Sequence, residues 1–274
     1  MTTTVIKLGG ELMDAAHQEE LKAIAADIGA LMQAGHTVVV VHGGGPQATA
    51  LQKRLGMEPR MVGGRRITDE GTLEVMKMAV AGAVNVDLCA RLTAAGARPV
   101  GLHGASSLAV RAKRRPPLVV SGGGPDPVDF GFVGDVQSVN TELLGLLGKN
   151  GYVPVMACLG ADEQGNTFNI NADTVANQVA VALKADALLL ITGTPGVLKD
   201  VKDPGSRIPV LTRADGNAAI KDGTIGAGMI PKVEESFKAL DEGVSQVIIL
   251  GRLTVGQLKR AVLEPGSVGT VLKN

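Results

Sequence analysis

The stretch Val38-Val39-Val40-Val41-His42-Gly43-Gly44-Gly45-Pro46 decides the fold of this chain. Its four consecutive valines predict a buried β-strand, and three glycines followed by a proline predict a tight turn into a helix with Pro46 in its first turn. Successive glycines let backbone N–H groups approach an anion closely, and the amino end of a helix adds partial positive charge there. The stretch therefore predicts a strand, a phosphate-binding turn and a helix.

A second strand with the same kind of ending lies nearer the start of the sequence. Thr4-Val5-Ile6-Lys7-Leu8 is followed by Gly9 and Gly10, and the segment before Gly35 carries apolar residues at helical spacing. Strand, helix and strand form a right-handed unit with parallel strands. Because neighbouring parallel strands present their carboxyl ends at one edge of the sheet, both glycine turns should face one ligand.

The rest of the chain alternates expected strands and helices in the same way. Further strands are expected at 98–102, 153–157, 187–191, 247–250 and 268–272. A short hairpin flap is expected at 56–67, and the pattern restarts as a second lobe near residue 187. This alternation predicts an α/β protein with a parallel sheet.

One long apolar helix is expected from Leu73 to about Ala95, with Thr68 capping its start. A helix of this length and composition often packs on something outside its own sheet. It therefore suggests the interface of a dimer.

Composition restricts the class of function. The chain has 274 residues, of which 45% are hydrophobic and 2% aromatic, and it has no Trp. This composition is a poor basis for stacking single-stranded nucleic acid. Lys+Arg and Asp+Glu number 27 each, so no overall charge attracts nucleic acid or an anionic membrane surface. No apolar run approaches the ~20 residues of a membrane span, and no signal peptide precedes the first strand.

Cysteine and histidine give no sign of a metal site. Cys89 and Cys158 lie in apolar patterns without metal-ligand spacing, which predicts buried thiols in a reducing compartment. The four histidines show no HxxxH or HExxH spacing, so His42 is expected to be structural. With the absence of a leader, these features predict a cytoplasmic protein.

Three charged residues are candidates for phosphate chemistry. Lys7 stands in an otherwise apolar strand beside two glycines, where the alternative is a lysine at the sheet edge that reaches water. Lys232 is expected in the first turn of a helix, a position that disfavours a cation unless an anion binds. Asp173 either favours its own helix start, which Asn171 would cap, or holds the two lysines in position.

Two other interpretations of the glycine turn remain open. Gly43-Gly44-Gly45-Pro46-Gln47-Ala48 fits the dinucleotide pattern G-x-G-x-x-A, but residues 57–60 lack the strand-end acidic residue that this fingerprint needs. The chain also lacks the G-x-x-x-x-G-K-[ST] sequence of a Walker-type nucleotide site. In the second interpretation, the glycines serve only to form turns and bind no ligand.

Five motifs in order resemble those of the amino acid kinase family. They are Lys7-Leu8-Gly9-Gly10, His42-Gly43-Gly44-Gly45, Gly64-Arg65-Arg66-Ile67-Thr68, Asn169-Ile170-Asn171-Ala172-Asp173 and Gly228-Met229-Ile230-Pro231-Lys232. The resemblance implies an open three-layer αβα sandwich with a mainly parallel central sheet. It also implies an N-terminal lobe, 1–184, for the acyl amino acid and dimerisation, and a C-terminal lobe, 185–274, for ATP with Mg2+, which is held mainly by the ATP phosphates.

The resemblance also implies roles for individual residues. Lys7 and Lys232 would neutralise the transferring phosphoryl group, and Asp173 would orient both lysines. Backbone donors to phosphate would come from Gly9, Gly10 and Gly44, and the acceptor would be held by Gly44, Gly45, Arg66 and Asn169. The acceptor implied is N-acetyl-L-glutamate, phosphorylated on its side-chain carboxylate in arginine synthesis by a homodimeric enzyme.

Two positions depart from the family pattern. Gly193 replaces the usual aspartate in Thr192-Gly193-Thr194-Pro195-Gly196, which affects nucleotide binding, and Gly104-Ala105-Ser106-Ser107 replaces Gly-Lys-Asp-Gly in the acceptor lobe. Two alternatives therefore accompany the main hypothesis. One is the same reaction on an aminoadipate derivative of lysine synthesis, and the other is a non-catalytic nucleotide-binding paralogue.

Overall fold

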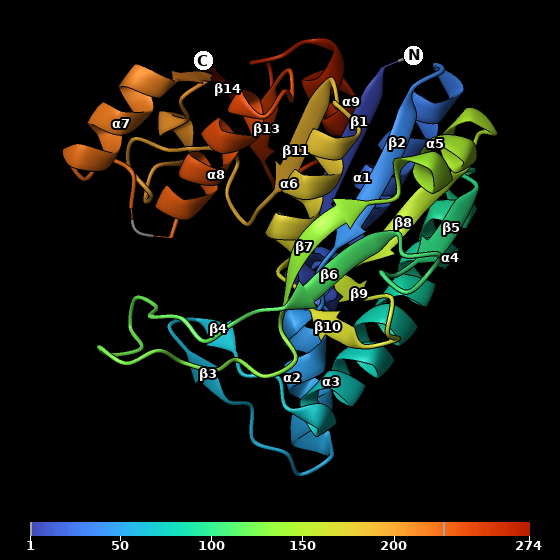
Figure 1. Ribbon diagram of the computed structural model, residues 1–274. Helices are drawn as coiled ribbons and strands as arrows, with labels where there is room; N and C mark the ends of the chain where they lie inside the picture. Colours follow the sequence, from blue (N-terminus) through green and yellow to red (C-terminus); the bar gives the residue numbers. More distant parts are fainter. Residues whose placement is uncertain (1, 227) are drawn as a thin grey trace.

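The computed structural model describes residues 2–226 and 228–274, and an eight-stranded central sheet runs through it (Figure 1). In spatial order the strands are β12 (Val210–Thr212), β14 (Thr270–Lys273), β13 (Val247–Leu250), β11 (Ala187–Ile191), β1 (Thr3–Leu8), β2 (Thr37–His42), β8 (Val153–Ala157) and β5 (Pro99–Leu102). Every neighbouring pair is parallel except β13 and β14. The predicted mainly parallel sheet is confirmed.

Helices cover both faces of this sheet and make three layers. One face packs against α1 (Gln18–Gln33), α4 (Asn85–Ala94) and α9 (Gln257–Leu263), and the other against α5 (Thr141–Lys149), α6 (Ala172–Ala182) and α8 (Ile230–Asp241). Within β2, Val38 and Val40 pack in the hydrophobic core on the face that α1, α4 and α9 cover. Val39 and Val41 pack in the core on the opposite face. The run of four valines is therefore buried on both faces, as a central parallel strand requires.

The remaining helices and small sheets complete the chain. They are η1 (Gly10–Met13), η2 (Ala15–His17), α2 (Gly45–Arg54), α3 (Glu70–Met76), the π-helix η3 (Lys77–Val84), η4 (Pro204–Ser206) and α7 (Arg213–Lys221). A hairpin pairs β3 (Met61–Val62) with β4 (Arg65–Arg66), which confirms the predicted flap. A second sheet has the order β10 (Thr167–Asn169), β9 (Leu159–Ala161), β6 (Val110–Arg114) and β7 (Gly134–Val139).

The predicted long helix is continuous but not uniform. It runs through α3, η3 and α4, and the middle eight residues have the wider π geometry. Thr68 does not cap it, because the Asp69 side chain accepts the hydrogen bond from Thr72 N, at 2.9 Å. Thr68 is instead fully buried and accepts a hydrogen bond from Asn169 Nδ2, at 3.1 Å. Cys89, in α4, was expected to be buried, but it is only partly buried.

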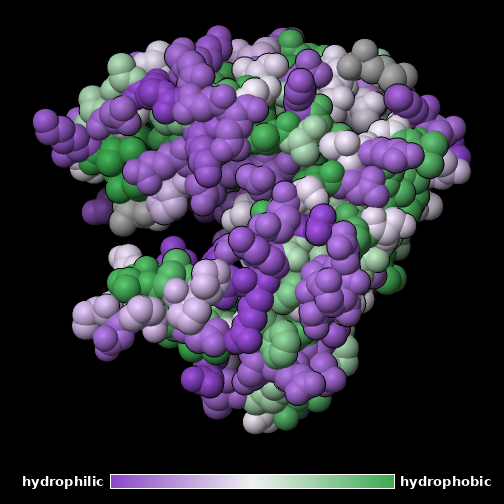
Figure 2. Space-filling model, in the orientation of Figure 1, coloured by the Kyte–Doolittle hydropathy of each residue, from purple (hydrophilic) through white to green (hydrophobic). Residues whose placement is uncertain are grey.

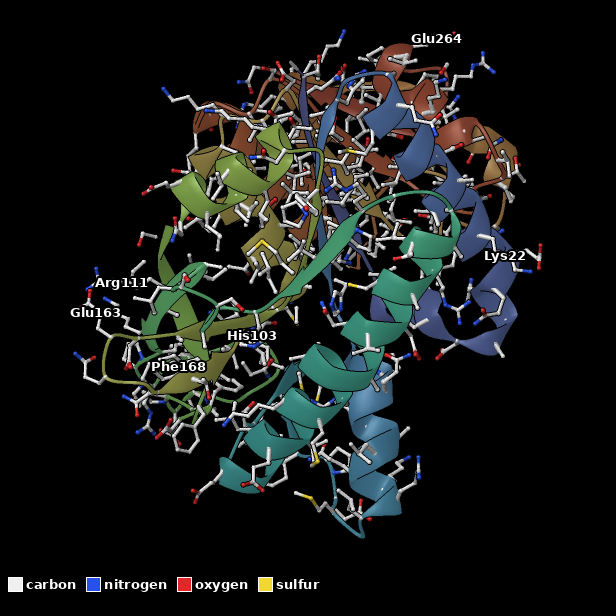
Figure 3. The ribbon with its side chains drawn as sticks, turned by 90° about the vertical axis from the view of Figure 1, so that its right-hand side faces the viewer. Lys22, His103, Arg111, Glu163, Phe168 and Glu264 are labelled. Atoms are coloured by element: carbon white, nitrogen blue, oxygen red, sulfur yellow. The ribbon has the colours of Figure 1, made fainter. Side chains whose placement is uncertain are left out.

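The second sheet carries a charged outer edge. Arg111 in β6 lies 3.2 Å from Glu163, and Figure 3 shows the two side chains together at the rim of this sheet. Both side chains are about half exposed, so this edge of β6 is in contact with solvent. Within the described residues, no helix combines the length and apolar character needed to cross a bilayer.

A buried carboxylate fastens the last helix to the first. Asp27 in α1 is 3% exposed, and its two oxygens accept hydrogen bonds from the backbone N–H groups of Gly256, Leu258 and Lys259, at 2.7, 2.8 and 3.2 Å. Residues 256–259 form the start of α9, whose free N–H groups need acceptors. Asp27 therefore joins the two ends of the chain across one face of the sheet.

Replacing Asp27 by alanine is expected to lower the free energy of unfolding by about 3 kcal/mol, because one buried and two part-buried N–H groups lose a carboxylate acceptor. Urea denaturation at pH 7 measures this change. Glu19→Ala in the same helix is the control, since the Glu19 side chain is 87% exposed and its loss should cost less than about 0.5 kcal/mol. Equal losses in the two variants would contradict this role for Asp27.

Candidate functional site

The two glycine turns predicted to face one ligand lie against each other at the carboxyl ends of β1 and β2. Gly43 N donates a hydrogen bond to Leu8 O, at 3.0 Å. A Cβ atom on Gly10 would stand 3.0 Å from Gly44 Cα and 2.9 Å from Pro46 Cδ. Side chains are therefore excluded at this contact, and the backbone of both turns is open to an incoming anion.

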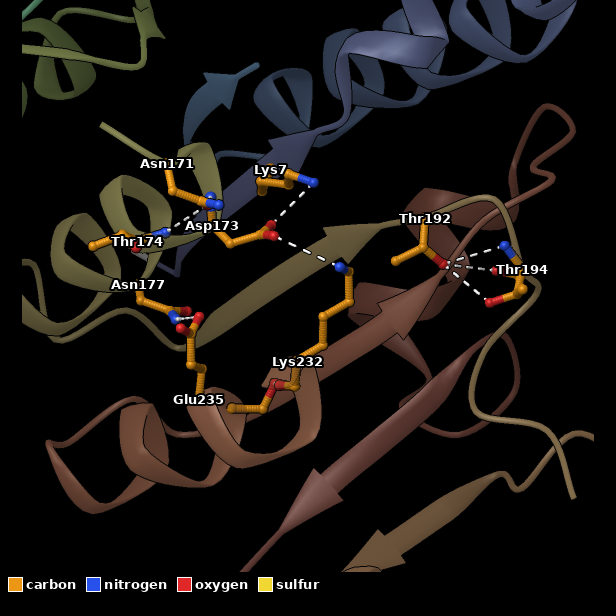
Figure 4. A network of polar contacts seen from close by, with 10 residues as sticks. Lys7, Asn171, Asp173, Thr174, Asn177, Thr192, Thr194, Lys232 and Glu235 are labelled. Carbon is orange, nitrogen blue, oxygen red and sulfur yellow. Dashed lines mark hydrogen bonds and ion pairs between the residues drawn. The ribbon is translucent and has the colours of Figure 1, made fainter. Parts of the chain in front are cut away.

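Asp173 brings two lysines from opposite ends of the chain together. Lys7 Nζ lies 3.0 Å from Asp173 Oδ1 and Lys232 Nζ lies 3.7 Å from Asp173 Oδ2, as Figure 4 shows. The exposed fraction of the side chain is 10% for Lys7, 28% for Lys232 and 19% for Asp173. Two ammonium groups against one carboxylate leave a net positive charge in a half-buried space, which favours an anion.

Each member of this cluster is held by its own element. Lys7 belongs to β1, which lies between β11 and β2, so the alternative of an edge-strand lysine is wrong. Asp173 lies in the first turn of α6, where the Asn171 side chain caps the helix as predicted and accepts from Asp173 N, at 2.7 Å. Lys232 lies in the first turn of α8, where a cation opposes the helix dipole.

Two cavities meet at the lysines. The larger, about 850 Å³, is lined by both glycine turns, Arg66, Asn169 and Asp173. The other, about 530 Å³, is lined by residues 191–194 and by Gly228 and Met229. Lys7, Glu11 and Lys232 line both. In Figure 2 the two cavities lie in a deep notch that opens on the left of the molecule.

Arg66 and Asn169 border the larger cavity from different elements. Arg66 in β4 donates hydrogen bonds from Nη2 to Gly45 O, at 3.2 Å, and to Thr49 Oγ1, at 2.7 Å. Partial burial of the guanidinium lowers the pKa of Arg66 below its ordinary value. Asn169 at the end of β10 is tied to the segment before α3, because its Nδ2 donates a hydrogen bond to Thr68 Oγ1. The structure thus brings together all the residues predicted for the site.

Several residues at the site were not predicted. Glu11 follows the first glycine turn, and Glu235 lies one helical turn after Lys232 and accepts from Asn177 Nδ2, at 3.3 Å. Helical spacing from Lys232 could have identified Glu235. At Gly193 a Cβ atom would meet nothing within 4 Å, so the absence of a side chain there leaves space beside the smaller cavity.

His42 is a structural residue, as predicted. It is fully buried at the end of β2, and its Nδ1 lies 2.8 Å from Gly43 O, so Nδ1 carries the proton and Nε2 accepts from Asn85 Nδ2, at 2.9 Å. Burial lowers the pKa of His42 from 6.5 to about 4, opposed by the hydrogen bond with Gly43. The ring is therefore neutral at physiological pH and holds the glycine turn in place.

This burial should make folding stability depend on pH. Between pH 6.5 and 4 the unfolded chain protonates His42 while the folded chain does not, so stability is lost as the pH falls through this range. The free energy of unfolding lost through His42 over this range is about 3 kcal/mol. Urea unfolding from pH 7 to pH 4 should show a steeper loss in the natural protein than in His42→Gln. Because the carboxylates titrate in both proteins, a difference between the two curves reports His42. Parallel curves would therefore contradict the lowered pKa of His42.

Comparisons with known proteins agree with this geometry. A model of the amino acid kinase family matches residues 2–251. The chain is 62% identical over 273 residues to the acetylglutamate kinase of Anaeromyxobacter dehalogenans, covering 100% of both chains. It is 59% identical over 268 residues to the acetylglutamate kinase of Sorangium cellulosum, covering 98% of this chain and 93% of the relative.

Solved structures share the fold. The structure of N-acetylglutamate synthase from Neisseria gonorrhoeae with coenzyme A and N-acetyl-glutamate has a TM-score of 0.82 and 26% identity, with 100% of this chain and 59% of that chain covered. A carbamate kinase from Giardia has a TM-score of 0.67 and 20% identity, with 99% and 98% covered, a likeness of fold alone. From its motifs, its fold and these matches, the chain belongs to the amino acid kinase family.

Proposed function

We propose that this chain transfers the γ-phosphoryl group of ATP to the side-chain carboxylate of N-acetyl-L-glutamate, in arginine biosynthesis. The observation that carries the proposal is the position of Asp173 between Lys7 and Lys232, where the two cavities meet. The names of the full-length relatives, acetylglutamate kinase, support the same reaction and acceptor.

The chemistry needs alignment and charge neutralisation more than proton transfer. A side-chain carboxylate has a reference pKa of about 4.3 and is already ionised at pH 7, so it needs no general base. One of its oxygens attacks the γ-phosphorus, the bond from that phosphorus to the β–γ bridging oxygen breaks, and ADP leaves with the electron pair. Lys7 and Lys232 neutralise the charge on the transferring group, and Asp173 holds both ammonium groups in position.

The larger cavity is proposed to hold the acceptor. Arg66 and Asn169 bind its α-carboxylate and neighbouring groups, and the backbone of Gly44 and Gly45 contributes donors. The N–H groups of Gly9, Gly10 and Gly44 meet the phosphates. Most of this cavity is lined by residues 1–184, which supports their assignment as the acceptor lobe.

The smaller cavity is proposed to hold ATP, and most of its lining comes from residues 185–274. The carboxylate of Glu11 lines both cavities. It fits a Mg2+ held mainly by the nucleotide, because Mg2+ commonly takes one or two carboxylates besides substrate phosphates. Bound in this way, Mg2+ supplies further neutralisation of phosphate charge.

The assembly and location are proposals as well. Met78 and Val86 on the helix from 70 to 94 are 51% and 63% exposed, which supports a homodimer through this helix. Both cysteines are free, which supports a reducing compartment such as the cytoplasm.

Trapping of the acyl phosphate with hydroxylamine, in the presence of ATP and Mg2+, tests the reaction. The natural protein should form the hydroxamate, and Lys7→Ala and Lys232→Ala should lower kcat by roughly 100- to 1,000-fold, because each removes a cation that meets the transferring phosphoryl group. Lys238→Ala, in the same helix as Lys232 and 69% exposed at its side chain, is the matched control and should keep kcat within about twofold. Unchanged kcat in the two site variants would refute the assignment.

A second measurement settles the acceptor. We expect kcat/KM for N-acetyl-L-glutamate to exceed that for N-acetyl-L-aminoadipate by about tenfold or more, since one extra methylene moves the carboxylate relative to a fixed pair of lysines. A preference for the longer acid would support lysine synthesis instead. Nucleotide binding without turnover of any acyl amino acid would support a non-catalytic paralogue.

A further inference from the structure

We propose that Gln52 is a positioning residue that fixes the Arg66 guanidinium for the α-carboxylate of the acceptor. This inference rests on the proposed function, because it concerns how the acceptor is held. Gln52 lies in the last turn of α2 and is 1% exposed, so its amide needs protein partners. Its Oε1 accepts a hydrogen bond from Arg66 Nη1, and its Nε2 donates to Thr72 Oγ1, at 3.1 Å.

The two partners fix the orientation of the Gln52 amide. A guanidinium can only donate, so the amide oxygen must face Arg66 and the NH2 group must face Thr72. Thr72 is 4% exposed and is itself held by the N-cap Asp69, whose pKa is lowered first by the hydrogen bond with the Thr72 side chain and next by that with Thr72 N. A buried series of hydrogen bonds therefore runs from the start of α3 through Gln52 to Arg66.

Arg66 needs this support because of where it lies. It belongs to a two-residue strand of a hairpin whose other members are largely exposed, and such a hairpin is weakly stable by itself. Three residues of α2 accept hydrogen bonds from the Arg66 guanidinium. Gln52 accepts from Nη1, and Thr49 and Gly45 accept from Nη2. An arginine has five N–H groups, so two remain for a ligand once these contacts among the described residues are made.

The expected consequence is confined to binding of the acceptor. Without the Gln52 oxygen the guanidinium can rotate, and an acceptor must fix it again at a cost in affinity. The lysines and the glycine turns make no hydrogen bond with Gln52 among the described contacts, so phosphoryl transfer and ATP binding should be unaffected. A split between the KM for the acceptor and kcat distinguishes positioning from a general structural role.

Steady-state kinetics of Gln52→Met and Gln52→Glu test the proposal. Gln52→Met keeps an unbranched side chain of similar size without a strong acceptor, and should raise the KM for N-acetyl-L-glutamate roughly tenfold, with kcat and the KM for ATP within about twofold. Gln52→Glu keeps an acceptor for Arg66 and should stay within about threefold of the natural protein.

The inhibition constant of 4-acetamidobutanoate is the internal control. This compound is N-acetylglutamate without its α-carboxylate, so its binding should change by less than about twofold in Gln52→Met if Gln52 acts through Arg66. Thr72→Val leaves the contact between Gln52 and Arg66 in place and should raise the KM for N-acetyl-L-glutamate by less than Gln52→Met does.

Three outcomes would overturn the inference. They are an unchanged KM for N-acetyl-L-glutamate in Gln52→Met, equal losses for N-acetyl-L-glutamate and 4-acetamidobutanoate, and a tenfold rise of KM in Gln52→Glu. If Gln52→Met does not fold, Gln52→Glu still tests the inference, because a tenfold rise of its KM for N-acetyl-L-glutamate would overturn it. A natural protein that turns over no acyl amino acid would instead refute the proposed function, and this inference with it.

Discussion

The ion pairs of one carboxylate with two ammonium groups are the interaction on which the rest of this molecule depends. Lys7 and Lys232 are 225 positions apart in the numbering, and among the described residues Asp173 is the one carboxylate that forms ion pairs with both, at 3.0 and 3.7 Å. Without the carboxylate, the two positive charges would repel each other in a half-buried space. With it, both are held near an anion site and remain available to a phosphoryl group.

The fold makes this convergence possible by placing strand ends together. The central sheet continues across the proposed boundary between residues 184 and 185, because β11 pairs with β1. The two cavities therefore lie along one edge of one sheet, and the pairing of α1 with α9 through Asp27 fastens the opposite ends of the chain.

The polar groups around the site divide into two kinds. The lysines, Arg66 and Asn169 line the larger cavity, whereas His42 and Gln52 are buried behind it and make hydrogen bonds to the residues that line it. A neutral imidazole holds the Gly43 carbonyl, and an amide holds a guanidinium. Each is a fully buried group with definite donor and acceptor sides, which is what fixes a neighbour in one orientation.

The sequence by itself determined seven of the eight strands of the central sheet, the glycine turns, the helix capped by Asn171 and the identity of the charged residues, because these depend on local spacing and backbone chemistry. It did not predict β12 or the second sheet of β10, β9, β6 and β7. The family resemblance implied that Asp173 orients the two lysines, but local spacing left a second role open for it, and only the tertiary structure decided that Asp173 lies between them. The tertiary structure also decided that Asp69 caps α3 and that Gln52 contacts Arg66. Such contacts join segments far apart in the chain, or choose between adjacent residues by burial. No period or local propensity encodes them, since they follow from how the elements pack.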